Sequence, residues 1–210
     1  WIEDRVGKIK WGDLNDFLDL RKELIKKDES IEWDIGKLRK EIFKEKLKHI
    51  RPTSLRNQIV NDAFEIFIDK RHLIKLYDGV EDSLKILSKK YELGVLTNGN
   101  ADIYKFEIGR YFKFSISSLE AKDNKPNRSH FDEASKKLEG IKFDEMLHIG
   151  DHQINDIIGA NNLGINTLWF NNNNNEWEQD SKKPNEFSSW KRLPEICLLY
   201  TSDAADDQLG

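Results

Sequence analysis

Three short polar clusters along the chain contain residue types that can bind a phosphate group and a hard cation. The first cluster is Thr97-Asn98-Gly99, a hydroxyl followed by an amide and a glycine. A hydroxyl and successive backbone N–H groups at a strand-to-helix turn suit a phosphate oxygen, and glycine lets the backbone approach a ligand closely. Because Asn-Gly also marks ordinary turns, a plain turn is the alternative interpretation of this cluster.

The second cluster is Lys125-Pro126. A lysine ammonium can neutralise the charge that develops on a phosphoryl group during its transfer. The proline favours an extended backbone at Lys125. Loop lysines usually face solvent, so this pair indicates a function only together with the other two clusters.

The third cluster contains two carboxylates five residues apart, Asp151 and Asp156. Asp151 follows a short apolar run, and Asp156 comes near the start of the next predicted helix. Mg²⁺ prefers such hard oxygen ligands and keeps several waters, so a metal site is expected, with a helix cap at Asp156 as the alternative. His148 is predicted to be a packed structural histidine, and His152 has no predicted role.

The elements that must position these clusters begin with a helical region over residues 1–73. Apolar residues recur there at helical spacing, and this pattern predicts a helical core rather than a ligand site. Pro52 ends one predicted helix, and Thr53 or Ser54 is expected to cap the next.

After Leu76 the pattern changes to strands alternating with helices. This alternation predicts an α/β fold with a doubly wound parallel sheet and helices on both faces. Ligands of such sheets bind outside the carboxyl ends of the strands, where the three clusters fall. The Asn171–Asn175 run is predicted to be a loop. The predicted strands are 91–96, 112–119, 146–149 and 165–170; the predicted helices are 81–90, one after residue 100, 129–138 and 155–162, the last followed by Gly164.

Composition excludes several classes of protein. The 210 residues are 38% hydrophobic and 34% charged, with a net charge of −4, which disfavours bulk nucleic-acid binding. No apolar run approaches the roughly 18 residues that a membrane span needs. The single cysteine, Cys197, excludes an intrachain disulfide and a multi-cysteine metal site, so a reducing cytoplasmic location is expected.

The order and spacing of the three clusters resemble motifs II, III and IV of haloacid dehalogenase (HAD) superfamily hydrolases. The matching phrases are Leu-Thr-Asn-Gly-Asn, Lys-Pro, and His-Ile-Gly-Asp with an acid five residues later. The resemblance covers about residues 1–196. It implies a Rossmann-like core over 74–196 and an inserted α-helical cap over 1–73.

The resemblance also implies an activity, that of a Mg²⁺-dependent phosphatase working through an aspartyl-phosphate. Thr97 and Lys125 would be catalytic, and they would bind the phosphate together with Asn98 and Gly99. Asp151 and Asp156 would bind Mg²⁺. The substrate would be a small phosphorylated metabolite, since the chain looks most like bacterial flavin-pathway phosphatases, which act on FMN or 5-amino-6-(5-phospho-D-ribitylamino)uracil. Neither nucleic acid nor a membrane is an expected partner.

The chain departs from the family's pattern at one point, because no Asp-x-Asp-x-Thr/Val motif is present to supply the nucleophile. We therefore expect a first strand upstream of Trp1, an inactive chain as given, and an open sheet with poor solubility. Residues 197–206 resemble a translated sequencing adapter, so 197–210 are predicted to be a non-native tail.

Three alternatives remain open from the sequence. Two belong to the same superfamily, a nucleotide 5′-phosphatase and a 2-haloacid dehalogenase; the latter needs no metal. The third is a non-catalytic binding protein with the same fold, which a genuine start codon just before Trp1 would favour.

Overall fold

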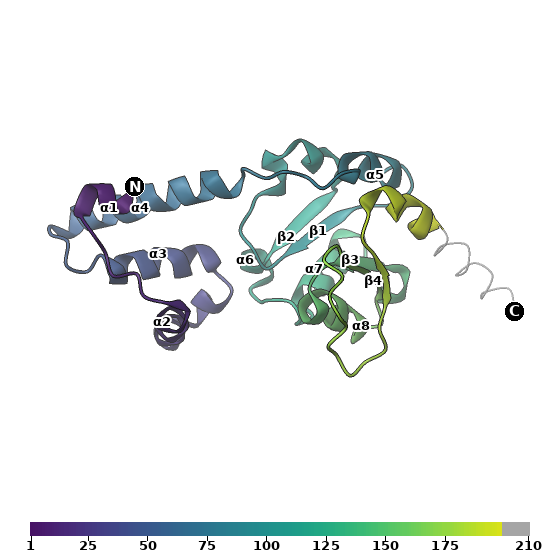
Figure 1. The fold of residues 1–210 in the computed structure, drawn as a ribbon. Coiled ribbons are helices and arrows are strands. Elements are labelled where there is room, and N and C mark those ends of the chain that lie inside the picture. The colour runs from purple at the N-terminus through teal and green to yellow at the C-terminus, as the bar shows by residue number, and fades with distance from the viewer. Residues whose placement is uncertain (199–210) are drawn as a thin grey trace, which may run out of the picture. The chain divides into compact units, whose positions relative to one another are not determined.

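The computed structural model describes residues 1–198, and its chain divides into two compact units. The first unit comprises Trp1–Ile74, Asn98–Asp102 and Ser117–Asn124, and the second comprises the remaining described residues. The predicted domain boundaries lie at 73/74 and 196/197, whereas this division assigns two short later segments to the helical unit. Most of the predicted tail lies outside the described residues. Figure 1 shows the elements of both units.

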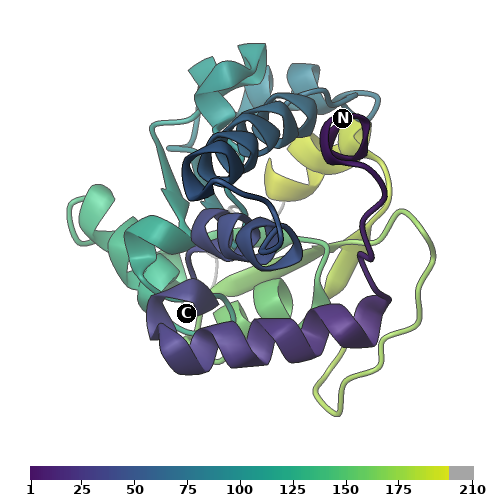
Figure 2. The ribbon, with the colours of Figure 1, turned by 90° about the vertical axis from the view of Figure 1, so that its left-hand side faces the viewer.

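The first unit is helical, as its apolar spacing predicts. Asp13 and Asp34 cap α2 and α3 by accepting hydrogen bonds from backbone N–H groups of the first turns. Figures 1 and 2 show α3 lying along α4, with α2 crossing α3. Its elements are α1 (Ile2–Val6), α2 (Leu14–Lys27), η1 (Glu29–Glu32), α3 (Ile35–Lys46), α4 (Thr53–Arg71) and α6 (Ser118–Ala121).

The predicted cap of α4 is wrong. The helix begins at Thr53, its N-cap is Pro52, and no side chain caps it. An N-cap residue has an extended backbone, which Pro52 adopts, whereas Thr53 is already helical and cannot serve.

The second unit contains every strand, although the last residue of β2 falls in the first unit. None of the helices within residues 1–198 has the length and hydropathy of a transmembrane span. The helices of the second unit are α5 (Val80–Leu87), α7 (Ser129–Lys137), α8 (Gly159–Asn161), the 3₁₀ turns η2 (Ile103–Lys105), η3 (Glu107–Tyr111), η4 (Phe143–Glu145) and η6 (Trp190–Arg192), and the π-helix η5 (Gln153–Ile158). The strands are β1 (Gly94–Thr97), β2 (Phe114–Ser117), β3 (Leu147–Gly150), β4 (Asn166–Phe170) and β5 (Asn185–Phe187).

Three features of this unit differ from the sequence prediction. The helix expected after residue 100 is a pair of 3₁₀ turns, η2 and η3. The helix expected over 155–162 starts earlier, as a π-helix, and continues as α8. Strand β5 was not predicted, because Asn185–Phe187 is too short to show an alternating pattern.

The strands form a Rossmann-like α/β arrangement that is interrupted in the middle. β3, β4 and β5 make a parallel sheet, with Gly150 beside Trp169 and Phe170 beside Phe187. β1 and β2 make a separate two-stranded sheet. Residues of β1 and β3 are mostly half-buried, whereas four of the five residues of β4 are buried. Within the described residues, β1 and β3 therefore each have one edge without a strand.

Candidate active site

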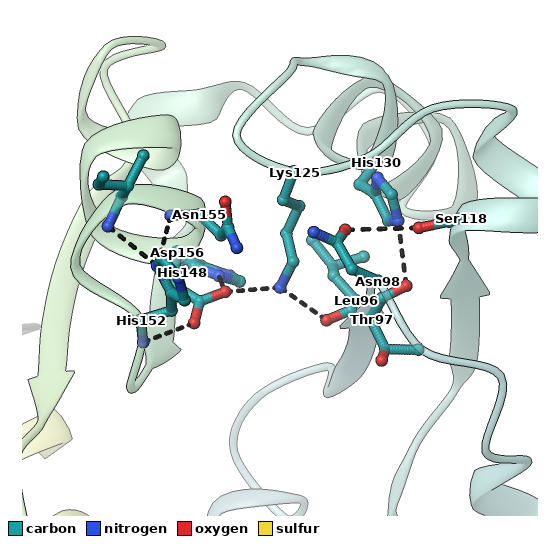
Figure 3. A network of polar contacts seen from close by, with 11 residues as sticks. Leu96, Thr97, Asn98, Ser118, Lys125, His130, His148, His152, Asn155 and Asp156 are labelled. Atoms are coloured by element: carbon teal, nitrogen blue, oxygen red, sulfur yellow. Dashed lines mark hydrogen bonds and ion pairs between the residues drawn. The ribbon is translucent and has the colours of Figure 1, made fainter. Parts of the chain in front are cut away.

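Lys125 connects the two sheets of the second unit. Its Nζ donates a hydrogen bond to the carbonyl oxygen of Leu96, in β1, at 2.8 Å. The same Nζ lies 2.6 Å from Oδ1 of Asp156, in the π-helix that follows β3 (Figure 3). Lys125 is only 7% exposed, so the alternative of an ordinary exposed loop lysine does not hold. The structure thus brings Lys125, Asp156 and the carboxyl end of β1 together.

Asp156 is a buried carboxylate with three neighbours. Besides Lys125, its Oδ2 accepts a hydrogen bond from the backbone N–H of His152 at 3.0 Å, and its Oδ1 lies 3.4 Å from Nε2 of His148. Burial raises the pKa of Asp156, but the hydrogen bond with His148 and the charge of Lys125 outweigh it and hold the pKa well below the ordinary value. Asp156 is therefore ionised, and the ion pair with Lys125 is charge-balanced.

His148 is a packed histidine, as predicted, and it also contacts the candidate site. Its ring packs edge-on against Phe131, with 5.2 Å between centroids, and its Nε2 also contacts Asp156. Burial lowers the pKa of His148, and its bond to Asp156 only partly opposes this shift. A neutral imidazole therefore lies against the Asp156 carboxylate.

His152, which had no predicted role, is the N-cap of the π-helix. Its Nδ1 accepts hydrogen bonds from the backbone N–H groups of Ile154 at 3.2 Å and Asn155 at 3.1 Å. Gly150 allows the close approach of this helix, because a Cβ there would lie 2.4 Å from Cβ and Cγ of Asp156. The sequence Gly-Asp-His thus turns the chain so that Asp156 lies against the end of β3.

Asp151 lies at the end of β3 but is exposed. Its backbone carbonyl accepts a hydrogen bond from Nε1 of Trp169 at 2.9 Å. Its carboxylate makes no hydrogen bond or ion pair within residues 1–198. That Asp151 shares a site with Lys125 stays a prediction.

The donor set fits a hard cation only in part. Asp151 offers an available carboxylate, whereas both oxygens of Asp156 already have partners. No group of three or more His, Cys, Asp or Glu side chains suited to a metal occurs in the described part of the chain. Mg²⁺ commonly takes one or two protein carboxylates and completes its shell with waters and phosphate oxygens. Asp151 therefore suits direct ligation, and Asp156 suits an indirect role through Lys125.

Thr97 lies at the carboxyl end of β1, and its backbone carbonyl is 3.2 Å from Nε2 of His130. His130 is a fully buried residue of α7. His130 was not predicted from the sequence; the available signal was a histidine beside Phe131 and Ala134 on the apolar face of the helix that follows Lys125-Pro126.

Asn98 and Gly99 belong to the first unit. Oδ1 of Asn98 lies 3.4 Å from Oγ of Ser118, which donates to Oδ1 of Asn124 at 2.7 Å (Figure 3 shows Asn98 and Ser118). Asn124 in turn donates to the carbonyl of Glu32 at 2.9 Å. These bonds hold the turn after β1; that Asn98 and Gly99 bind phosphate stays a prediction.

A cavity of about 530 Å³ in the second unit contains none of the predicted site residues. It is bordered by β4, β5 and the segment after them, with Leu168, Asn171, Glu186 and Arg192 among its lining residues. None of the residues with predicted chemistry lines it, so this cavity does not define the candidate site.

Comparison with known proteins places the chain among hydrolases. It is 33% identical over 113 residues to 5-amino-6-(5-phospho-D-ribitylamino)uracil phosphatase YigB of Escherichia coli, covering 54% of this chain and 47% of that protein. It is 25% identical over 166 residues to pyrimidine 5′-nucleotidase PynA of Streptococcus pneumoniae, covering 73% and 70%. The chain thus spans about half the length of the first of these curated relatives.

A solved structure of similar fold is that of 2-haloacid dehalogenase from Pseudomonas syringae. It has a TM-score of 0.83 and 28% identity, and the match covers 90% of this chain and 82% of that one. The family model for haloacid dehalogenase-like hydrolases matches residues 17–170, which is more than half of the chain. With the polar clusters at strand ends and the buried Lys125–Asp156 pair, this match shows that the chain belongs to the haloacid dehalogenase-like hydrolase family.

Proposed function

We propose that the complete protein is a Mg²⁺-dependent phosphomonoesterase that acts on a small phosphorylated metabolite through an aspartyl-phosphate. The observation that carries the proposal is the buried Lys125, whose ammonium is held between the end of β1 and Asp156. Relatives named as phosphatases and nucleotidases support the same reaction class. Small flavin-pathway or nucleotide phosphates are the proposed substrates.

In this mechanism Lys125 provides fixed positive charge for the transferring phosphoryl group. Asp156 orients the ammonium, and a group oriented in advance stabilises a transition state without the cost of reorganisation. The hydroxyl of Thr97 and the backbone of Asn98 and Gly99 would bind the remaining phosphoryl oxygens. Catalysis would then rest on positioning and charge, as in other phosphoryl transfers.

The proposed Mg²⁺ would be held by Asp151, with Asp156 acting indirectly through Lys125. When bound, the ion would offset the negative charge of the phosphate group. The exposed carboxylate of Asp151 at the end of β3 supports this assignment.

The nucleophilic aspartate is not among the described residues, and we propose that a further strand between β1 and β3 carries it. The support is the interrupted sheet: within residues 1–198, one edge of β1 and one edge of β3 pair with no other strand. Lys125 contacts the chain on both sides of that interruption. An aspartate at the carboxyl end of such a strand would lie beside its ammonium.

The test is phosphate release by the complete natural protein, with and without Mg²⁺, on a panel of phosphomonoesters. We expect turnover that EDTA abolishes and that Lys125→Met lowers at least about 100-fold, as for other single electrostatic groups. The 210-residue chain should be inactive. Absence of activity in the complete protein on the whole panel would refute the proposal.

A second candidate is 2-haloacid dehalogenase activity, which the similarity to the Pseudomonas syringae enzyme favours. Halide release from 2-chloropropionate by the same protein distinguishes the two activities. Halide release that is unaffected by EDTA, without phosphate release, would favour the dehalogenase.

A further inference from the structure

Helix α7 contains a fully buried histidine, His130, that the proposed mechanism does not yet use. Its Nε2 lies 3.2 Å from the backbone carbonyl oxygen of Thr97, the last residue of β1. A carbonyl oxygen can only accept a hydrogen bond, so Nε2 of His130 is the protonated ring nitrogen and donates to it. Both residues belong to the second unit. His130 is therefore a donor to the residue that is proposed to bind phosphate.

The surroundings of His130 would suit an apolar side chain. The other buried residues of α7, Phe131 and Ala134, are apolar, and the exposed fraction of His130 is 0%. Moving an imidazole out of water costs free energy unless its polar atoms find partners, and a leucine would not incur this cost. The hydrogen bond to the Thr97 carbonyl is thus the contact that distinguishes histidine from leucine at this position.

Two consecutive carbonyl groups at the end of β1 are held by side chains that lie five positions apart in the chain (Figure 3). Lys125 donates to the carbonyl oxygen of Leu96, and His130 donates to that of Thr97. Helix α7 is itself held against β3, because the ring that follows His130 in the sequence packs edge-on against His148 with 5.2 Å between centroids. The end of β1 is therefore bonded to an element that has a second, independent contact.

Fixing the Thr97 carbonyl also fixes the N–H of the same peptide group. A trans peptide is planar, and its N–H points opposite to its carbonyl. Because the Thr97 carbonyl is directed at His130, the N–H of that peptide group is directed away from His130. Backbone N–H groups at this turn are proposed donors to the phosphate. A donor that is oriented before the reaction stabilises a transition state without reorganising.

We propose that His130 is a positioning residue for phosphoryl transfer, acting through the carbonyl of Thr97. The inference rests on the proposed phosphatase function and adds a residue to its site. His130 does not touch the phosphate. It holds one peptide group at the end of β1, so that the hydroxyl of Thr97 and the N–H of that group keep a single orientation. Without this donor the peptide group can rotate, and the phosphoryl group is bound less tightly in the transition state.

The experiment replaces His130 in the complete protein and measures phosphate release at saturating Mg²⁺. His130→Gln keeps a side-chain N–H near the position of Nε2, whereas the shorter His130→Asn and the apolar His130→Leu do not. We expect the Asn and Leu variants to lower kcat about tenfold, the effect of one hydrogen bond, and the Gln variant to stay within about threefold of the natural protein. The matched control is His49→Leu, which removes an exposed histidine and should leave kcat unchanged.

A double-mutant cycle tests whether His130 acts through Thr97. Thr97→Val removes the hydroxyl and keeps the backbone carbonyl. We expect His130→Leu to lower kcat less in the Thr97→Val protein than in the natural one, because the hydroxyl that it positions is already absent. Thermal melts of every variant, with kinetics measured well below each Tm, separate this effect from a loss of folded protein. Additive losses in the cycle would overturn the inference.

Binding of inorganic phosphate, measured by calorimetry on the same variants, gives a readout that does not depend on turnover. If the protein hydrolyses no substrate but His130→Leu and His130→Asn bind phosphate more weakly than His130→Gln, the phosphatase function fails and the positioning role stands. If hydrolysis occurs and the three substitutions lower kcat equally or not at all, the positioning role fails and the phosphatase function stands. If there is no hydrolysis and phosphate binding is undetectable or unchanged in all variants, both fail.

Discussion

At the scale of single residues, the pair formed by Lys125 and Asp156 dominates the second unit. The two side chains are 8% and 10% exposed, so each charge has lost most of its water. The ammonium donates a hydrogen bond to the carbonyl oxygen of Leu96, and the carboxylate accepts one from the backbone N–H of His152. Because desolvation offsets much of the mutual attraction of a buried pair, its main effect is to fix geometry rather than to add net stability.

Removing one member of the pair should therefore be costly. We expect Asp156→Asn to lower the free energy of unfolding by about 3–5 kcal/mol, because it leaves a buried ammonium without its counter-charge. Urea unfolding of the complete protein, followed by circular dichroism, measures the change. Lys183→Met, which breaks the exposed pair with Glu186, should cost less than about 1 kcal/mol. A loss as small as this for Asp156→Asn would show that water reaches the pair.

At the scale of elements, the π-helix and α8 set the position of the segment that carries Lys125. Gly159, the first residue of α8, packs directly on Pro126. A Cβ at Gly159 would lie 2.9 Å from both Cα and the carbonyl oxygen of Pro126, which are backbone atoms that cannot rotate away. The absence of a side chain here lets Lys125 reach Asp156 from the neighbouring segment.

Gly159→Ala should consequently separate these two elements. We expect a loss of about 1–3 kcal/mol in stability from overpacking, together with a fall in kcat of the complete protein. Gly140→Ala is the control, since Gly140 has φ +86° but no atom within 4 Å of its Cβ position. It should cost about 1–2 kcal/mol through backbone strain and leave kcat unchanged. Thermal melts and steady-state kinetics measure both effects, and an unchanged kcat in Gly159→Ala would contradict this account.

At the scale of the whole molecule, the interrupted sheet is the principal feature. β1 pairs only with β2, and β3 pairs only with β4, within the described residues. Apolar residues of these two strands, among them Val95, Leu96, Leu147 and Ile149, are only half-buried as a result. An edge without a partner exposes backbone N–H and carbonyl groups, and it invites pairing with another chain.

Hydrogen exchange should report this interruption. In the 210-residue chain we expect rapid exchange at β1 and β3 and slower exchange at β4, which is paired on both edges. In a longer natural chain that includes the proposed additional strand, amides of β1 and β3 should gain protection of at least about tenfold, because each gains a ladder partner. Equal exchange of these strands in the two chains would exclude a strand between them.

The sequence by itself determined the alternation of strands and helices and the three polar clusters at strand ends. Both follow from local information, since apolar runs and turn residues act over a few neighbouring positions. The order and spacing of Thr97, Lys125 and Asp151 were also enough to indicate the family, which the match over residues 17–170 confirms.

Only the tertiary structure decided which partners these residues have. Lys125 and Asp156 are 31 positions apart, and His130 and Thr97 are 33 apart, so no local pattern could reveal their contacts. The π-helix and the two 3₁₀ turns have no local pattern that distinguishes them from an α-helix, and β5 is too short to show alternation. Partners, burial and charge state depend on the folded arrangement of the chain, whereas element type and the order of the clusters are set along it.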